Sequence, residues 1–75
     1  RKEIRRIMST LEKDFTHLKN KGVVHEDVHP EDASLGLLAL IMGLVEVWLT
    51  DSTLFDLMDR APRIVWDYLE KLRKS

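Results

Sequence analysis

The segment from Leu35 to Leu49 constrains this chain most, because it is apolar on every side when it is wound as a helix. Glu46 is the only charged residue in it. A helix of this kind must be buried all round. Two flanking helices of about 20 residues cover only part of it, since each presents one apolar stripe about 100° wide. The sequence therefore predicts that partners outside this chain cover the rest.

The size and charge of the chain support the same expectation. A chain of 75 residues forms one domain, and a core of that size rarely supplies more than about 3 to 5 kcal/mol. There is no cysteine for a disulfide. The net charge of −1 gives no electrostatic footprint for nucleic acid or an anionic membrane. Association is then the expected source of further stability.

The spacing of apolar residues predicts an all-α fold with three helices. The first covers residues 3–20 and ends before Gly22, which can take the left-handed conformation. The second covers 31–50, after Pro30 and with His29 as an unusual N-cap. The third covers 60–73, preceded by a short helical turn at 54–58.

Pro62 leaves two possible starts for the third helix. If Asp59 is the N-cap, Pro62 lies in the first turn and removes only an N–H group that has no helical partner. If the helix begins at Asp56, a kink is expected between Met58 and Pro62. We favour the start near residue 60.

The second helix has two apolar faces of different character. One carries mostly small residues, which allow another helix to approach closely. The other carries bulkier and more flexible side chains, which suit a core or a cavity wall. Ordinary core packing explains either face equally well. The small face consists of Gly36, Ala39, Leu40, Gly43 and Val47, and the bulky face of Leu38, Ile41, Met42, Val45 and Leu49.

The residues from His25 to His29 match the zinc-protease pattern H-E-x-x-H. That chemistry requires both histidines on one helix, one turn apart. Pro30 follows the second histidine directly and disfavours helical geometry there. We therefore predict a solvated loop, with no catalytic residue, no metal and no cofactor. Glu46 is expected to pair with Arg60, Arg63 or a cation of a second subunit.

A membrane span is the other reading of the apolar segment. Spanning needs about 18 to 20 apolar residues, and Asp32, Glu46 and Asp51 shorten the run. No secretory signal precedes it. The chain, which begins at Arg1, is expected to be a piece of a longer cytoplasmic protein without a membrane partner.

Several short motifs follow one another in a characteristic order. Gly43-Leu44 and Trp48-Leu49 come first, Phe55-Asp56-Leu57 follows, and Ala61, Tyr68-Leu69 and Leu72-Arg73 complete the series. In this order the chain resembles the C-terminal regulatory domain of TetR-family transcriptional repressors. It is most similar to the branch that controls multidrug-efflux pumps, where a Gly-Leu helix leads through a short loop to a Phe-Asp-Leu helix.

The resemblance implies that residues 1–75 form a single regulatory and dimerisation fragment, from which the DNA-binding helix-turn-helix is absent. The last two helices would form a four-helix bundle in a homodimer. A small apolar effector would bind the intact protein and release operator DNA. Effector-cavity candidates are Leu38, Ile41, Met42 and Val45, and dimer-interface candidates are Gly36, Leu40, Gly43, Val47, Ile64, Val65, Tyr68 and Leu72.

The sequence departs from the family pattern at two of these places. Met42 replaces a residue that is commonly polar in relatives, and His29 replaces the usual acidic cap. A generic helical interaction module without ligand sensing is the alternative function. A stable symmetric dimer in sedimentation would favour the repressor domain, and a monomer would favour the interaction module.

Overall fold

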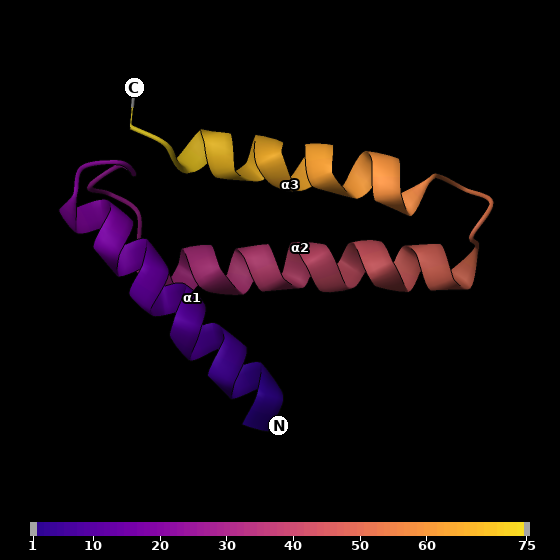
Figure 1. The fold of residues 1–75 in the computed structure, drawn as a ribbon, viewed down its shortest axis with the longest axis horizontal. Coiled ribbons are helices and arrows are strands. Elements are labelled where there is room, and N and C mark those ends of the chain that lie inside the picture. The colour runs from indigo at the N-terminus through magenta and orange to yellow at the C-terminus, as the bar shows by residue number, and fades with distance from the viewer. Residues whose placement is uncertain (1, 75) are drawn as a thin grey trace.

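A computed structural model describes residues 2–74 and shows three helices: α1 (Lys2–Asn20), α2 (Pro30–Thr50) and α3 (Leu57–Leu72). The described part of the chain forms no strand, so the expected all-α class is confirmed. α2 and α3 run antiparallel and side by side, and α1 crosses the N-terminal part of α2 (Figure 1). The N-terminal half of α1 projects away from the α2–α3 hairpin (Figure 1).

Gly22 ends α1 in the way the sequence predicts. Its φ angle is 77°, a conformation that costs glycine nothing because it has no Cβ. The N–H of Gly22 donates to the carbonyl of Lys19 at 3.0 Å, and the N–H of Val23 donates to the carbonyl of Leu18 at 2.9 Å. These two bonds form a Schellman motif, which satisfies the last carbonyls of the helix.

Pro30 begins α2, and His29 is the N-cap, although its side chain makes no capping hydrogen bond. The N–H of Asp51 closes the other end by donating to the Val47 carbonyl at 3.0 Å. The Asp51 carboxylate then accepts from the hydroxyl and the main-chain N–H of Thr53. Both bonds lower the pKa of Asp51, the hydroxyl bond most, because they stabilise the charged form. These bonds hold the turn that follows α2.

The start of α3 differs from the prediction. Asp56, not Asp59, is the N-cap, and its carboxylate accepts from the N–H groups of Met58 and Asp59 at 3.1 and 3.3 Å. Residues 54–56 are not helical, so the short turn expected at 54–58 is absent. α3 continues through Pro62 to Leu72. Two capping bonds at Asp56 and a continuous apolar stripe therefore outweigh the one helical bond that Pro62 removes.

The core lies where α1 crosses α2. Phe15 of α1 and Ala33 and Leu37 of α2 are buried together. Ser34 is completely buried beside them, and its hydroxyl donates to the Pro30 carbonyl at 2.7 Å, so the buried hydroxyl has a hydrogen-bond partner. Half-buried side chains from the rest of the chain pack around this centre: Leu11, Leu18, Val28, Val65, Tyr68, Leu69 and Leu72.

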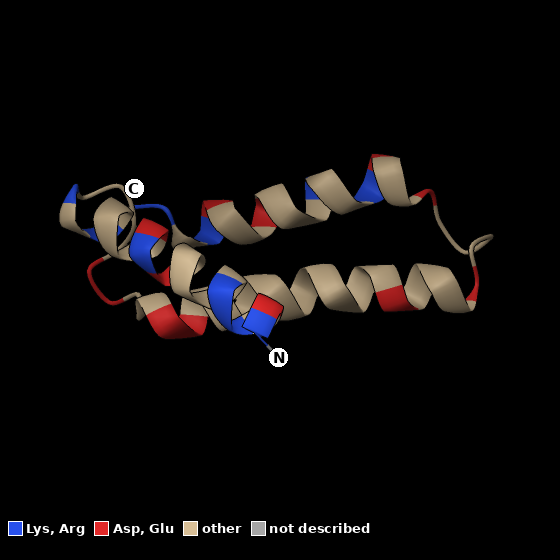
Figure 2. Ribbon diagram, turned by 60° about the horizontal axis from the view of Figure 1, so that its bottom comes forward, with Lys and Arg blue, Asp and Glu red and all other residues tan. Residues whose placement is uncertain are grey.

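The molecule is a thin layer, with extents of 41 × 32 × 15 Å. A layer of that thickness is scarcely wider than one helix with its side chains. Lys, Arg, Asp and Glu occur along α1 and α3, whereas α2 carries acidic residues near its start and at Glu46 and is otherwise uncharged (Figure 2). The most apolar helix is thus packed on two sides and open on the others.

Candidate functional site: an apolar pocket between α2 and α3

An apolar pocket of about 320 Å³ lies between the C-terminal half of α2 and the N-terminal half of α3. Every residue that lines it has an apolar side chain. This composition suits an uncharged, hydrophobic group rather than a polar ligand. The lining residues are Ile41, Leu44 and Val45 of α2, and Leu57, Met58, Ala61, Pro62 and Val65 of α3.

Two of the four predicted effector residues, Ile41 and Val45, line this pocket. Leu38 is half-buried one turn before Ile41, and the side chain of Met42 is half exposed. Neither Leu38 nor Met42 is part of the pocket lining. Leu38 lies on the same side of α2 as Ile41 and Val45, at the i, i+3, i+7 spacing of one helix face, but one turn closer to the start of the helix than the pocket extends.

The contribution of α3 to the pocket was not predicted. Leu57, Ala61 and Val65 follow one another at four-residue intervals, and Met58 and Pro62 repeat that interval beside them. This spacing is a helical signal in the sequence. Leu57 and Met58 were nevertheless expected in a separate helical turn at 54–58, and the structure places them in the first turn of α3.

Gly36 and Tyr68, two predicted dimer residues, contact each other within this chain. The Tyr68 ring lies so close to Gly36 that a Cβ built there would be 2.4 Å from its hydroxyl oxygen and 3.2 Å from Cζ. The same hydroxyl donates to the Ala33 carbonyl at 2.9 Å. Burial raises the pKa of Tyr68, because it disfavours the tyrosinate. Tyr68 thus fixes the position of α3 on α2.

The other dimer candidates fall into two groups. Gly43 and Val47 are exposed on α2, and a Cβ at Gly43 would meet no atom within 4 Å. The remaining four candidates are half-buried along α2 and α3: Leu40, Ile64, Val65 and Leu72. Val65 lines the apolar pocket, and Leu72 packs against the core.

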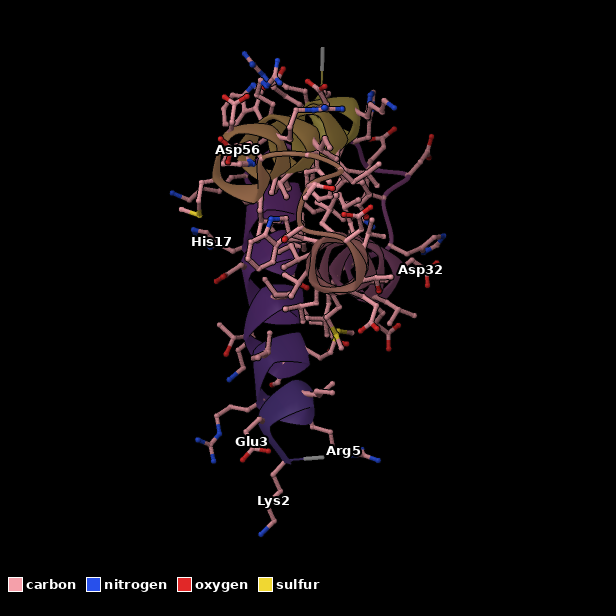
Figure 3. The ribbon with its side chains drawn as sticks, turned by 90° about the vertical axis from the view of Figure 1, so that its right-hand side faces the viewer. Lys2, Glu3, Arg5, His17, Asp32 and Asp56 are labelled. Carbon is pink, nitrogen blue, oxygen red and sulfur yellow. The ribbon has the colours of Figure 1, made fainter. Side chains whose placement is uncertain are left out.

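The H-E-x-x-H residues do not have zinc-protease geometry. His25 and His29 lie in the connection between α1 and α2, and α2 begins only at Pro30. His17 lies on the side of α1 opposite to Asp32 of α2 (Figure 3). Among residues 2–74 no group of three His, Cys, Asp or Glu side chains could hold a metal ion.

Glu46 is not paired with Arg60 or Arg63 as predicted, and its pairing with a cation of a second subunit stays a prediction. Its side chain is exposed on α2, so it reaches solvent without a partner in α3. Arg63, one of the predicted partners, is instead 3.5 Å from Asp59, one turn earlier in α3. The second ion pair of the described chain joins Arg73 to Glu70 at 3.4 Å. Exposure satisfies the carboxylate at no desolvation cost, so pairing within the chain is unnecessary.

A family model described as the C-terminal region of MAATS-type transcriptional repressors, a TetR C-terminal family, matches residues 1–74. The chain belongs to this family. A TetR-type repressor region is regulatory rather than catalytic, and regulators of this type are generally dimeric and bind DNA through an N-terminal domain. No curated protein and no solved structure is similar enough to this repressor region to count as a match.

The expectation that the apolar helix of this repressor region is too short for a membrane was wrong as an argument from length. α2 has 21 residues and is long and apolar enough to cross a bilayer by length and composition. The core helix of a soluble protein passes the same test, so the criterion is weak evidence for a span. Membership of a repressor family accounts for such a helix without a membrane.

Proposed function

We propose that this chain is the dimerisation and effector-sensing part of a TetR-like repressor of the multidrug-efflux branch. Residues 1–75 act as one cytoplasmic regulatory fragment, and operator DNA is bound by an N-terminal helix-turn-helix outside them. A small apolar effector binds one arrangement of the dimer better than the other and so lowers the affinity for the operator. No cofactor and no catalytic step takes part.

The observation that carries this proposal is the open apolar surface of α2. Only Ala33, Ser34 and Leu37 are buried in this helix. Large apolar side chains remain exposed along the rest of it, including Met42 at 50% and Leu49 at 67%. A contiguous apolar surface of this kind is typical of an interface or a ligand site. Both are expected of a regulatory domain that dimerises and binds an apolar effector.

The two faces of α2 supply two different surfaces for these tasks. Ile41 and Val45 already line an apolar pocket, so we assign them to the effector wall, with Leu38 and Met42 beside them. Gly43 and Val47 are open, and Gly43 has room for a second helix at close distance. We assign these two to the dimer contact, together with the half-buried residues of the α2–α3 hairpin.

A matched pair of substitutions tests this assignment in the intact repressor. Val45→Asn and Val47→Asn replace the same residue type at similar exposure, 38% and 44%. Val45→Asn should weaken binding of an uncharged apolar probe such as N-phenyl-1-naphthylamine about tenfold, because a polar side chain in the lining removes part of the transfer energy that the pocket supplies. Val47→Asn should weaken self-association, measured by sedimentation, and leave probe binding unchanged at protein concentrations high enough to keep both variants dimeric. The reverse pattern would show that the two faces are assigned the wrong way round.

A bulkier change tests close helix approach on its own. Gly43→Leu should weaken the dimer by about 1 to 3 kcal/mol, because the added side chain holds the two helices apart. Gly43→Ala is the control with a much smaller side chain. An unchanged dimer dissociation constant for Gly43→Leu would contradict the dimer contact at this face. A monomeric wild-type protein would instead favour a helical interaction module that binds another protein.

A further inference from the structure

Main-chain hydrogen bonds join the α1–α2 connection to the residues that end α3. The N–H of His25 donates to the carbonyl of Leu72 at 3.0 Å, and the N–H of Lys74 donates to the carbonyl of Val23 at 2.8 Å. Val24 and Arg73 face each other between these bonds as an antiparallel bridge. We call this pairing of residues 23–25 with 72–74 the clasp. It is the one place in the described chain where segments far apart in the sequence pair through their main chains.

Val23 takes part in bonds to two helices at once. Its N–H donates to Leu18 in the last turn of α1, and its carbonyl accepts from Lys74 just beyond α3. The side chain of Val23 is 45% exposed, so its position depends on these main-chain bonds more than on packing. Gly22, at φ 77°, sets the direction in which Val23 leaves α1. A single residue, Val23, therefore joins the end of α1 to the end of α3 through its main chain.

The surroundings of the clasp make it resistant to independent movement of either helix. Val24 is only 5% exposed, although it belongs to a connection. On the same side of the molecule, Leu72 packs against the core that Phe15 shares with α2. A rigid, hydrogen-bonded contact of this kind can transmit a displacement, whereas a solvated loop would absorb it.

We propose that the clasp is a conformational link that transmits a change at the C-terminal end of α1 to the last turn of α3 through Val23. The link itself does not depend on the function proposed above. Its consequence does, because α3 belongs to the proposed dimer bundle and α1 leads towards the preceding part of the repressor. In the intact repressor the clasp would transmit changes between the dimer bundle and the part of the protein that precedes α1.

Proline at position 74 cuts the link with little other change. Lys74→Pro removes the N–H that donates to Val23, and Arg73 already has φ −70° and ψ 139°, which suits a residue before proline. Lys74→Ala keeps the N–H and is the matched control. Gly22→Ala is the perturbation on the α1 side, since alanine is strained at a φ of 77°.

Hydrogen exchange of individual amides in the intact repressor measures the transmission. In the Lys74→Ala background, Gly22→Ala should speed exchange at residues 69–72 about fivefold relative to residues 40–44 of α2. In the Lys74→Pro background the same perturbation should change that ratio less than about twofold, because the link is already cut. The reference amides in α2 separate this local effect from a general loss of stability.

The proposal is overturned if Gly22→Ala leaves the α3 amides unchanged in the Lys74→Ala background, or if it changes them equally in both backgrounds. Should Lys74→Pro prevent folding, His25→Pro is compared with His25→Ala, because it removes the bond to Leu72 and leaves Val23 bonded to Lys74. Gly22→Ala should then still speed exchange at residues 69–72 about fivefold, and loss of that effect would overturn transmission through Val23. Amide exchange needs neither a dimer nor an effector. Sedimentation of the wild-type protein therefore tests the proposed function separately.

Discussion

Gly36 and Gly43 lie on nearly the same side of α2, about two turns apart, yet alanine should have opposite effects at the two positions. A Cβ at Gly36 would be 2.4 Å from the Tyr68 hydroxyl oxygen, whereas a Cβ at Gly43 would meet nothing within 4 Å. A contact at 2.4 Å is too short to persist, so Tyr68 must move. Its hydroxyl would then lose the bond to the Ala33 carbonyl.

The size of each effect follows from these contacts. Replacing glycine by alanine within a helix gains about 0.8 to 1.0 kcal/mol. At Gly36 this gain is opposed by the loss of a hydrogen bond, about 0.5 to 1.5 kcal/mol, and by overpacking, about 1 to 3 kcal/mol. Gly36→Ala should therefore destabilise the fold by about 0.5 to 3.7 kcal/mol. Gly43→Ala should stabilise the monomer fold by up to about 1 kcal/mol.

Urea unfolding followed by circular dichroism, at one protein concentration, measures both free energies. Tyr68→Phe provides the second arm of a double-mutant cycle, because it removes the oxygen that collides and leaves only Cζ at 3.2 Å. The cost of Gly36→Ala should fall by at least about 1 kcal/mol in the Tyr68→Phe background. Equal costs in both backgrounds, or a stabilising Gly36→Ala, would refute the role of Tyr68 in fixing α3 on α2.

Two further predictions concern α3. Asp56→Ala should cost about 0.5 to 2 kcal/mol in urea unfolding, because two N–H groups lose their acceptor. Asp56→Asn is the near-neutral control, and an equal loss in both variants would contradict capping by a side-chain oxygen. Because burial raises the pKa of Tyr68 above its usual value of 10.0, the neutral form stabilises the fold at lower pH. That stability should be lost as the pH rises above about 10, and Tyr68→Phe should flatten this part of the stability profile. If Tyr68→Phe left the dependence of stability on alkaline pH unchanged, the stabilising role of the neutral Tyr68 hydroxyl would be contradicted.

Local sequence features predicted the boundaries of α1 and α2 to within about one residue. Gly22 can end a helix at no steric cost, and Pro30 favours a first helical residue, so each boundary follows from the chemistry of one or two residues. The start of α3 was harder, because Asp56 and Asp59 are both capable N-caps. The structure uses both acidic residues: Asp56 caps, and Asp59 lies in the first turn, where the helix dipole favours it.

Local sequence features did not predict the contacts between segments that are far apart in the sequence. The pocket depends on Met58 and Pro62 lying on one continuous helix, which follows only once Asp56 is known to be the cap. The contact between Gly36 and Tyr68 joins positions that no periodicity relates. The clasp is a single bridge between Val24 and Arg73, and neither lies in a run that alternates as a strand does. The types of the residues involved are visible in the sequence, whereas their pairing depends on how α3 packs against α2.

The position of the core gives a physical reason why dimerisation and effector binding should be linked. Buried residues and long-range hydrogen bonds gather at the N-terminal end of α2, whereas the pocket and Gly43 lie beyond it. Binding to the folded form adds directly to its stability, so whatever covers that far end also stabilises the hairpin. An effector at Ile41 and Val45 and a partner helix at Gly43 and Val47 would then share one poorly covered helix. Each should change the affinity for the other by the same factor. Equal dimer dissociation constants with and without a saturating apolar effector would contradict this coupling.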